Sequence, residues 1–390
     1  MKNPPADGHV PRRFAPTALM LGNIVTGCAV LAPAGMLSEL SSGLGVSIRD
    51  AGLLVTFGAI MLCVGSPITA SLTSRIERRT LLAATLAVLA LGNLASAFAP
   101  DYASLLAIRL VMLAVGALYT PQAAGTAALI VPAEKRGSTI AYIFLGWSLA
   151  AAVGLPLIAL IASRYGWRTA YGGIGAIGCI GFLLLAWRLP RGLTGTPVNL
   201  KTWADVGRNR LILLLLLITM LQMSGQFVVF TFMGPLLRGL AQADAHEIGL
   251  VFLIYGAFGF IGIALATRIV DSWGAYRSSM LSTTLILTGI TGWALSAGIY
   301  PLMACSVAIW GLGFASTNSM QQVRLVSAAP ALASASVSLN TSVLYIGQAV
   351  GSAIGGLLYA GGWLHASGYV AAGFVALALV TLMLTRPATR

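Results

Sequence analysis

Apolar residues occur in long runs along the chain, and short polar or Pro/Gly-rich breaks separate these runs. Each run has roughly the 20 residues that a helix needs to cross a bilayer. Lipid offers no partner for backbone N–H and C=O groups, so the runs predict transmembrane helices and not strands. The predicted helices are 16–37, 51–73, 81–99, 104–131, 138–162, 169–187, 211–236, 249–267, 278–298, 301–327, 334–360 and 369–385.

Composition agrees with an all-α integral membrane protein. Hydrophobic residues make up 58% of the 390 positions, charged residues only 8%, and the mean hydropathy is +0.89. The polar start MKNPPADGHVPRRF leads into a full-length apolar run, so we expect no cleavable signal peptide.

The basic residues predict how the chain crosses the membrane. Lys and Arg collect in cytoplasmic loops. With a cytoplasmic N-terminus and twelve helices, eighteen of the 23 Lys and Arg lie inside and four outside, with Arg109 left within a helix. Both termini are therefore expected in the cytoplasm. The net charge of +13 reflects this topology and not a nucleic-acid partner.

Matched sequence features indicate an internal repeat. Gly146 and Gly154 precede Gly347 and Gly355 by 201 positions, and Pro132 precedes Pro330 by 198. Two parallel repeats around a central binding region are a transporter architecture. We therefore expect two pseudo-symmetric six-helix bundles. The boundaries are 1–187 for the N-terminal bundle, 188–210 for a cytoplasmic linker and 211–390 for the C-terminal bundle.

Small residues in the fifth and eleventh helices are candidate helix-packing positions, because small residues allow close backbone approach in lipid. Their occurrence in both halves favours these helices as the contact between two rocking bundles. An ordinary packing face without a moving part is the alternative. The positions are Gly146, Gly154, Pro156, Gly347, Gly351 and Gly355.

Residues that carry enzyme or metal chemistry are not arranged for it in this sequence. The four cysteines all fall in apolar runs without paired spacing, and HEIG at His246 lacks a second histidine. No metal, no cofactor and no catalytic residue is expected.

Several motifs resemble the major facilitator superfamily, whose loop 2–3 frame reads G-x-x-x-D-R-x-G-R-R. This chain has Ala70, Ser74, Arg75, Ile76, Glu77, Arg78 and Arg79 in that frame. Arg109 resembles the arginine motif of the fourth helix, and GLP at 154–156 resembles the exporter signature of the fifth. The resemblance is strongest to the bacterial sugar and arabinose efflux permeases of the 12-helix drug:proton antiporter group. Nucleoside and chloramphenicol exporters are near relatives.

The resemblance implies a fold of two six-helix bundles, and cytoplasmic charge clusters that latch helix ends and favour one access state. The alternative is that these charges do not latch the helix ends and only anchor the positive loops in the cytoplasm. Proposed gating residues are Arg75, Glu77, Arg78, Arg79, Arg268, Asp271 and Arg277.

Ionisable residues within the predicted helices are scarce. All ten acids fall in tails, loops or helix ends, and Val30 stands where the sugar-efflux relatives commonly carry an acid. Arg109 is the one charge placed inside a helix. Intramembrane charges are usually functional. Arg109 is thus expected to exchange acidic partners or bind an anionic substrate, with outward snorkelling or capping of backbone carbonyls as the alternative.

Neutral polar residues on the cavity helices are candidate substrate contacts, and interhelical hydrogen bonding is the alternative for each. Thr120 is eleven positions from Arg109, so on a straight helix the two share a face. The candidates are Asn23, Thr26, Arg109, Thr120, Gln222, Gln226, Asn318, Gln321, Gln322, Asn340, Tyr345 and Gln348.

Together these features favour a monomeric secondary transporter of the bacterial inner membrane. It is expected to export a small neutral polar solute, such as a sugar, nucleoside or phenicol drug, with protons as the coupling ion. An uncoupled facilitator of the same fold is the alternative, because no carboxylate lies within a predicted helix. Partners are the lipid bilayer and the solute.

Overall fold

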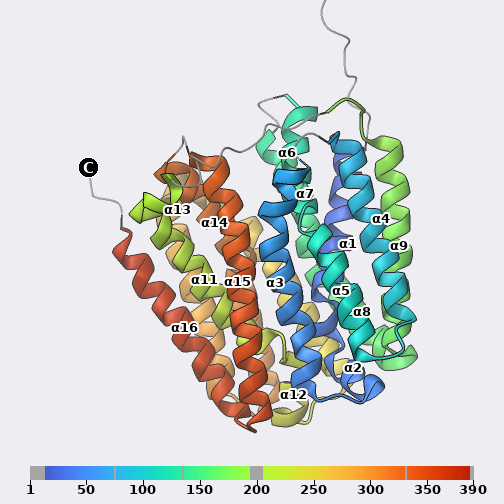
Figure 1. The fold of residues 1–390 in the computed structure, drawn as a ribbon. Helices are drawn as coiled ribbons and strands as arrows, with labels where there is room; N and C mark the ends of the chain where they lie inside the picture. The colour runs from blue at the N-terminus through green and yellow to red at the C-terminus, as the bar shows by residue number, and fades with distance from the viewer. Residues whose placement is uncertain (1–13, 74–75, 133–135, 194–204, 330–331, 387–390) are drawn as a thin grey trace, which may run out of the picture.

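The computed structural model describes residues 14–73, 76–132, 136–193, 205–329 and 332–386. Every regular element within these ranges is helical, and the long helices run side by side (Figure 1). The first half of the chain contains α1 (Ala15–Gly35), α2 (Leu37–Leu44), α3 (Ile48–Leu72), α4 (Arg78–Ala97), α5 (Tyr102–Gly116), α6 (Tyr119–Ile130), α7 (Arg136–Leu149), the π-helical turn η2 (Ala150–Gly154), α8 (Leu155–Tyr165) and α9 (Trp167–Arg188). The second half contains α11 (Arg210–Phe230), α12 (Met233–Ala241), α13 (Ala245–Leu295), α14 (Tyr300–Ala328), α15 (Ala333–Ala360) and α16 (Leu364–Leu384).

Eleven helical stretches within the described ranges are long and apolar enough to cross a membrane. The remaining predicted segment, 278–298, is the second part of α13. This element has 51 residues, and Gly274 inside it has the non-helical angles φ 78° and ψ 157°. A straight helix of that length would be about 77 Å long, more than twice the hydrocarbon thickness of a bilayer. The chain therefore crosses back at Gly274, and all twelve predicted segments coincide with helices.

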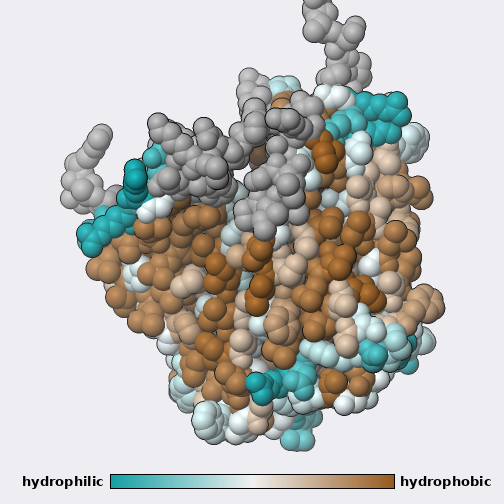
Figure 2. Space-filling model, viewed as in Figure 1, coloured by the Kyte–Doolittle hydropathy of each residue, from teal (hydrophilic) through white to brown (hydrophobic). Residues whose placement is uncertain are grey.

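The surface between the two ends of the bundle is apolar. Large side chains such as Leu91, Val111, Leu183 and Leu377 are more than half exposed, and Figure 2 shows hydrophobic residues covering the long faces of the helices between hydrophilic ends. Such a belt matches lipid tails and not water. The chain is a multi-pass membrane protein.

Four predicted helices are interrupted, and in three of them a proline follows the interruption within a few residues. In the fourth, α1 continues through Pro33 and ends two residues later at Gly35. The predicted helix 104–131 breaks at residues 117–118, helix 16–37 ends early at Gly35, helix 211–236 breaks at 231–232, and helix 138–162 contains η2. Proline has no N–H, so the carbonyl four residues before it loses its helical partner. The carbonyl and proline pairs are Ala29 and Pro33, Ala117 and Pro121, Ala152 and Pro156, and Thr231 and Pro235. Our sequence prediction treated these segments as continuous helices, which was wrong.

Two groups of helices form the bundle. In the first, α1 packs on α7 and α9, α3 on α5, and α4 on α9; in the second, α11 packs on α15 and α16, and α13 on α14 and α16. The groups meet where α3 contacts α15, where α13 contacts α8 and η2, and where α2 contacts α12. Figure 1 shows α2 and α12 together at one end, here called the α2–α12 end. The opposite end holds the start of α1 and the end of α16 and is called the linker end, because α9 finishes and α11 begins there.

Acidic residues at the α2–α12 end act as helix caps. Asp101 accepts from the Ser104 amide at 2.8 Å, and Asp244 and Glu247 form a capping box at the start of α13. Asp50 pairs with Ser47 in the first turn of α3. A carboxylate is stabilised at a helix N-terminus. These four acids therefore stabilise helix starts at the membrane boundary.

Candidate functional site

A hydrogen-bonded group of polar side chains joins α1, α6 and α7 in the first half. Thr120 Oγ1 donates to Asn23 Oδ1 at 2.8 Å, and the Trp147 indole N–H donates to Thr120 Oγ1 at 3.0 Å. Asn23 is fully buried and its Nδ2 donates to the Ile143 carbonyl at 3.0 Å. Asn23 is thus committed to interhelical bonding, whereas Thr120 and Trp147 are only half-buried. The sequence analysis did not single out Trp147.

A corresponding group joins α11, α14 and α15 in the second half. Asn340 accepts from Thr219 Oγ1 at 2.7 Å and donates through Nδ2 to Asn318 Oδ1 at 3.0 Å. Asn340 is fully buried, and Asn318 is half-buried. In both groups a half-buried side chain, Thr120 or Asn318, is held by a buried asparagine from a neighbouring helix. The polar groups of the two halves therefore have the same construction.

The glutamine pair of α11 forms bonds to other helices. Gln222 Nε2 donates to Thr283 Oγ1 at 2.7 Å, and Gln226 Oε1 accepts from the Trp310 indole N–H at 2.8 Å. Both glutamines are about 1% exposed. Amides inside a membrane bundle are commonly satisfied in this way. Here the structure shows the interhelical bonding that the sequence analysis kept as the alternative to substrate contact.

An aromatic cluster, which the sequence analysis missed, surrounds Gln226 and its partner Trp310. The Tyr255 ring lies 5.0 Å from Phe230, 5.2 Å from Trp310 and 5.0 Å from Phe314, measured between ring centroids. These residues come from three separate helices, so no spacing within one apolar run could have indicated the cluster.

Gln321 lies toward the linker end and is part of a buried polar network. Its Nε2 donates to the Leu215 carbonyl at 3.1 Å, and its Oε1 accepts from Arg324 Nη1 at 3.1 Å. Arg324 also donates to Thr385 Oγ1 at 2.5 Å, which ties α14 to the end of α16. The sequence analysis assigned Arg324 to the cytoplasmic charge, but the structure buries this side chain within α14.

The other candidates differ in how their polar atoms are used. Thr26 Oγ1 donates to the Gly22 carbonyl one turn earlier, so its hydroxyl is satisfied within α1. Gln322 is half-buried. Gln348 is 2% exposed, and its Nε2 has no hydrogen-bond partner among the residues that the structure describes. A buried donor without a partner is unusual, which makes Gln348, next to nearly buried Tyr345, the most distinctive of the set.

Arg109 is completely buried on α5 and faces the backbone of α1. Its Nη1 donates to the Ala29 carbonyl at 3.1 Å and lies 3.4 Å from the Tyr171 hydroxyl, and Nη2 lies 3.5 Å from the Val30 carbonyl. The Ala29 carbonyl is the one that Pro33 leaves without a helical partner. In the described part of the chain no carboxylate pairs with Arg109. Arg109 and Thr120 do not share one helix, because the chain breaks at residues 117–118, but both side chains contact α1.

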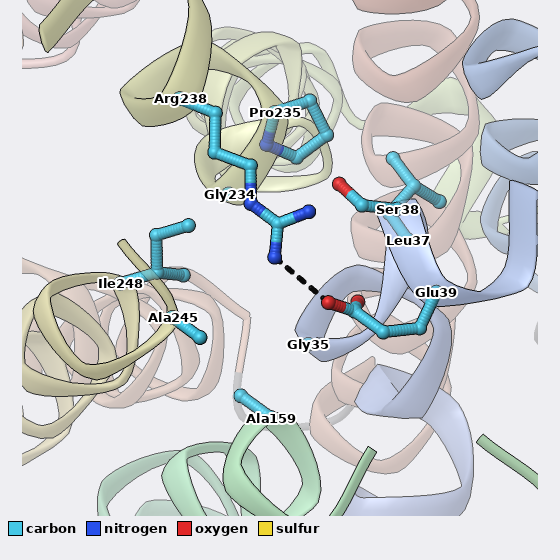
Figure 3. Close-up of a pocket in the computed structure, with 10 residues that line it drawn as sticks. All are labelled: Gly35, Leu37, Ser38, Glu39, Ala159, Gly234, Pro235, Arg238, Ala245 and Ile248. Atoms are coloured by element: carbon cyan, nitrogen blue, oxygen red, sulfur yellow. Dashed lines mark hydrogen bonds and ion pairs between the residues drawn. The ribbon is translucent and has the colours of Figure 1, made fainter. Parts of the chain in front are cut away.

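One ion pair connects the two halves at the α2–α12 end. Arg238 Nη2 lies 2.8 Å from Glu39 Oε1, joining α12 to α2 (Figure 3). The space beside the pair is lined by Gly35, Ser38, Ala159, Gly234 and Ile248, among others, and has a volume of about 10 Å³. Such a volume holds about one water molecule. The space beside this ion pair is therefore too small for an organic solute.

Two glycines allow the halves to touch deeper in the bundle. A methyl group on Gly256 of α13 would collide with the Cα of Ala152 in η2, and one on Gly52 of α3 would collide with the Phe232 ring. Ser352 Oγ donates to the Gly52 carbonyl at 3.4 Å. Pro156 in the sequence GLP frees a backbone carbonyl and favours the π-helical turn η2. Ala152, which Gly256 contacts, lies in this turn.

The matched glycines serve contacts inside each half. A Cβ on Gly146 would lie 2.5 Å from the Met20 carbonyl oxygen of α1, and one on Gly347 would lie 2.5 Å from the Met220 carbonyl oxygen of α11. The others of the set also lie against α1 or α11 and are Gly154, Gly351 and Gly355. These glycines therefore pack inside each half. The helices that carry them do contact the other half, η2 and α8 against α13 and α15 against α3, as the sequence analysis expected. The glycines at that contact are Gly52 and Gly256, which lie on the facing helices.

Charged residues at the linker end show part of the expected gating cluster. Glu77 accepts from the Gly192 amide at 2.6 Å and from Thr80 Oγ1 at 2.9 Å. These two bonds, led by that of Gly192, hold the pKa of the Glu77 carboxyl below its usual range. The Arg78 amide also donates to the Leu193 carbonyl at 2.8 Å. Glu77 thus joins the start of α4 to the end of α9 within the first half.

The remaining gating candidates are exposed or lie outside the described residues. Arg268 and Arg277 are exposed on α13 on either side of Gly274. Arg75 and the Asp271 side chain are not described, so the expected latch at Asp271 stays a prediction.

Comparisons with known proteins identify relatives over nearly the whole chain. The sequence profile of the Major Facilitator Superfamily matches residues 19–352. The inner membrane transport protein YdhP of Escherichia coli (strain K12) is 29% identical over 350 residues, 88% of each chain. A probable sugar efflux transporter of Mannheimia succiniciproducens is 26% identical over 363 residues, 90% of this chain and 88% of the relative. The crystal structure of a D-xylose-proton symporter superposes with a TM-score of 0.77 at 16% identity, covering 96% of this chain and 98% of that one.

Proposed function

Because this chain belongs to the Major Facilitator Superfamily, we propose that it exports a small, neutral, polar organic solute by alternating access. The chain is a membrane transporter and not an enzyme. The proposed solutes are a sugar, a nucleoside or a phenicol-type drug. The name of the Mannheimia relative, a probable sugar efflux transporter, supports export of the first class.

The absence of buried carboxylates is the observation that carries the proposal. Within the described ranges, every Asp and Glu with a described side chain lies in a loop or near a helix end. The interior instead holds amides, hydroxyls and two arginines, Arg109 and Arg324. A cationic drug needs a carboxylate to offset its desolvation. Neutral amides and hydroxyls suit a solute with hydroxyl groups, which both donates and accepts hydrogen bonds.

Five of the predicted contacts fit direct substrate binding better than the others. They are half-buried or retain an unused polar atom, whereas Asn23, Asn340 and Gln226 are committed to neighbouring helices. The five are Thr120, Asn318, Gln322, Tyr345 and Gln348.

The orientation of the chain follows from its charge. We place the linker end in the cytoplasm, because basic residues gather there and the positive-inside rule applies to short loops. Glu39 and Arg238 then close the periplasmic side, so the structure corresponds to a state that is closed toward the outside. We further propose that residues 1–187 and 211–390 move as two bundles about the Gly52 and Gly256 contacts.

Proton coupling is the first candidate for the energy source, and uncoupled facilitation is the second. The lack of an intramembrane carboxylate among the described residues favours the second, because proton antiport needs a group that takes up and releases a proton.

Transport by proteoliposomes tests both candidates. Purified protein is first screened by thermal shift against pentoses, nucleosides and chloramphenicol, because a ligand of the folded state raises the melting temperature. The best ligand, radiolabelled, is then added to vesicles with an acidic lumen. A proton antiporter accumulates it above the outside concentration, and a facilitator only equilibrates it. Stabilisation by organic cations alone would contradict the proposed substrate class.

A further inference from the structure

We propose that a hollow between the linker ends of α4 and α9 binds the phosphate headgroup of an anionic phospholipid. The hollow has a volume of about 640 Å³ and opens to the outside of the bundle. It lies apart from the polar groups inside the two halves, so it is not part of the proposed transport path. Its lining residues are Glu77, Arg79, Thr80, Ala83, Ala84, Phe182 and Arg191.

Positive charge dominates the rim of the hollow. Arg79 and Arg191 line it from α4 and from the segment after α9, and Arg78 and Arg188 neighbour them in sequence. Within the described part of the chain, neither Arg79 nor Arg191 forms a close ion pair or a hydrogen bond, although both attract the Glu77 carboxylate at longer range. Arginine carries several N–H donors in a planar fork that matches phosphate oxygens. Two unused guanidinium groups at one hollow therefore favour a phosphate ligand.

The single acid in the hollow does not cancel this charge. Glu77 uses its two carboxylate oxygens to accept from the Gly192 amide and the Thr80 hydroxyl. These bonds fix the carboxylate against the backbone and leave the guanidinium donors available. Two arginines, Arg79 and Arg191, thus face one carboxylate in the hollow.

The deeper part of the hollow is apolar and continues into the lipid-facing surface. Ala84 is exposed six residues into α4, about 9 Å from its start. Phe182 of α9 completes the wall, and Ile180 and Leu183 beyond it are 60% and 63% exposed. Figure 2 shows the hydrophilic ends of α4 and α9 directly adjoining this hydrophobic surface. A lipid with its phosphate at the arginines would lay an acyl chain along Ala84 and Phe182.

The combination of charge and depth favours a lipid over a soluble phosphate. Basic pockets between helices at the cytoplasmic membrane boundary are typical sites for anionic headgroups. A soluble phosphate would use the arginines alone and leave the apolar wall without a partner. The experiment therefore compares cardiolipin, phosphatidylglycerol, phosphatidylcholine and inorganic phosphate as probes.

Binding is measured on the full-length purified protein by thermal shift and by native mass spectrometry at several lipid concentrations. The test variant Arg79→Gln/Arg191→Gln removes the two rim charges. The control Arg208→Gln/Arg210→Gln removes two exposed charges from the same end of the molecule. A third variant, Ala84→Trp, fills the hollow and keeps every charge.

We expect cardiolipin or phosphatidylglycerol to stabilise the parent protein and phosphatidylcholine not to do so. The Arg79→Gln/Arg191→Gln variant should lose about tenfold or more in lipid affinity, Ala84→Trp should also bind more weakly, and the Arg208→Gln/Arg210→Gln control should stay within about twofold. Equal losses in the test and control variants would overturn the site, because they would show a general charge effect. Stabilisation by inorganic phosphate that Ala84→Trp leaves unchanged would overturn the assignment to a lipid.

Discussion

Arg109 Nη1 lies 3.1 Å from the carbonyl oxygen of Ala29, the α1 carbonyl that Pro33 deprives of its helical N–H. The guanidinium thus replaces a missing backbone donor, and it also approaches the Val30 carbonyl, at 3.5 Å. This contact satisfies the buried guanidinium although no acidic partner pairs with it among the described residues. It also connects α5 to the interrupted segment of α1, which leads to α2 and the Glu39 gate.

A double-mutant cycle tests this relationship. Arg109→Ala leaves the Ala29 carbonyl buried and unpaired, which costs about 1–3 kcal/mol of stability, and we expect transport to be lost. Pro33→Ala restores an N–H at the required place, so the double variant should be more stable than the sum of the two single changes predicts. Unfolding of the purified proteins measures the difference.

The control for this cycle is Arg168→Ala. Arg168 Nη2 donates to the Ala99 carbonyl at 3.0 Å, which no proline frees. Its effect should add to that of Pro33→Ala within a few tenths of a kcal/mol. Arg109→Lys should retain partial transport if charge alone matters. Simple additivity of Arg109→Ala and Pro33→Ala would contradict the capping role.

The contact between Gly256 and η2 gives a second prediction. Gly256→Ala places a methyl group against the Ala152 backbone, which cannot rotate away as a flexible side chain can. Overpacking of this kind costs about 1–3 kcal/mol, and here the cost falls on the state in which α13 contacts η2. Transport should fall by about tenfold or more. Gly249→Ala on the same helix has open space around it and should transport like the parent. Equal rates for the two variants would show that the halves do not meet at Gly256.

Breaking the Glu39–Arg238 pair should open the α2–α12 end more often. The two side chains are 19% and 41% exposed, and such partly exposed pairs contribute up to about 1 kcal/mol. Glu39→Gln should therefore raise the open fraction by up to about fivefold. An Ala159→Cys reporter in the wall of the gate measures it through labelling by an impermeant maleimide. The charge-exchanged variant Glu39→Arg/Arg238→Glu should return labelling toward the parent level. If neither Glu39→Gln nor the charge exchange changes labelling, the pair has no role in gating.

The Glu77 contact predicts a defined pH dependence. The Gly192 and Thr80 bonds lower the pKa of Glu77 in the folded protein. A carboxyl with a lowered folded pKa stabilises the protein above its unfolded pKa, about 4.3, and loses this effect as the pH falls through the lowered value. The melting temperatures of the parent and Glu77→Gln should hence differ by a constant amount from pH 8 to about pH 5 and converge at lower pH. A difference that appears only above pH 7 would contradict this assignment.

The sequence predicted the number and order of the helices because lipid imposes a simple rule on composition. It did not predict the breaks at Met36, at Ala117 or at Phe232, although a proline lies within four residues of each. A proline inside an apolar run can bend, end or π-distort a helix, and which of these occurs depends on neighbours that satisfy the freed carbonyl. Arg109 is such a neighbour for Ala29. Its contact lies 80 positions away along the chain, beyond the reach of local patterns.

The candidate site was predicted by residue type but not by partner. Asn23, Thr120, Asn318 and Asn340 were all expected, and the structure brings them together in two related groups. Their partners Trp147 and Thr219 were missed, because their roles follow from the packing of three helices. The matched glycines illustrate the same limit. Their spacing indicated close packing correctly, but only the packed structure shows that α1 and α11 are the helices they meet.

Gln348 and Gln226 separate substrate binding from structural bonding. Gln226 Oε1 accepts from buried Trp310, so Gln226→Ala leaves the indole N–H unpaired and should lower stability by about 1–3 kcal/mol. Gln348 Nε2 has no partner among the described residues. Gln348→Ala removes an unsatisfied donor and should leave the melting temperature of the empty protein unchanged or slightly raised. If this donor binds the solute, the same change should raise KM by about tenfold, as the loss of one such bond predicts.

The two glutamine variants are compared in one thermal-shift and transport series. The ligand should stabilise Gln226→Ala by as many degrees as it stabilises the parent, because the binding atoms are intact. It should stabilise Gln348→Ala less, although that protein is as stable as the parent when empty. A Gln348→Ala protein with parental KM would show that the Gln348 amide is a packing group, and so would one that unfolds as easily as Gln226→Ala. The proposed site would then consist of Thr120, Asn318, Gln322 and Tyr345.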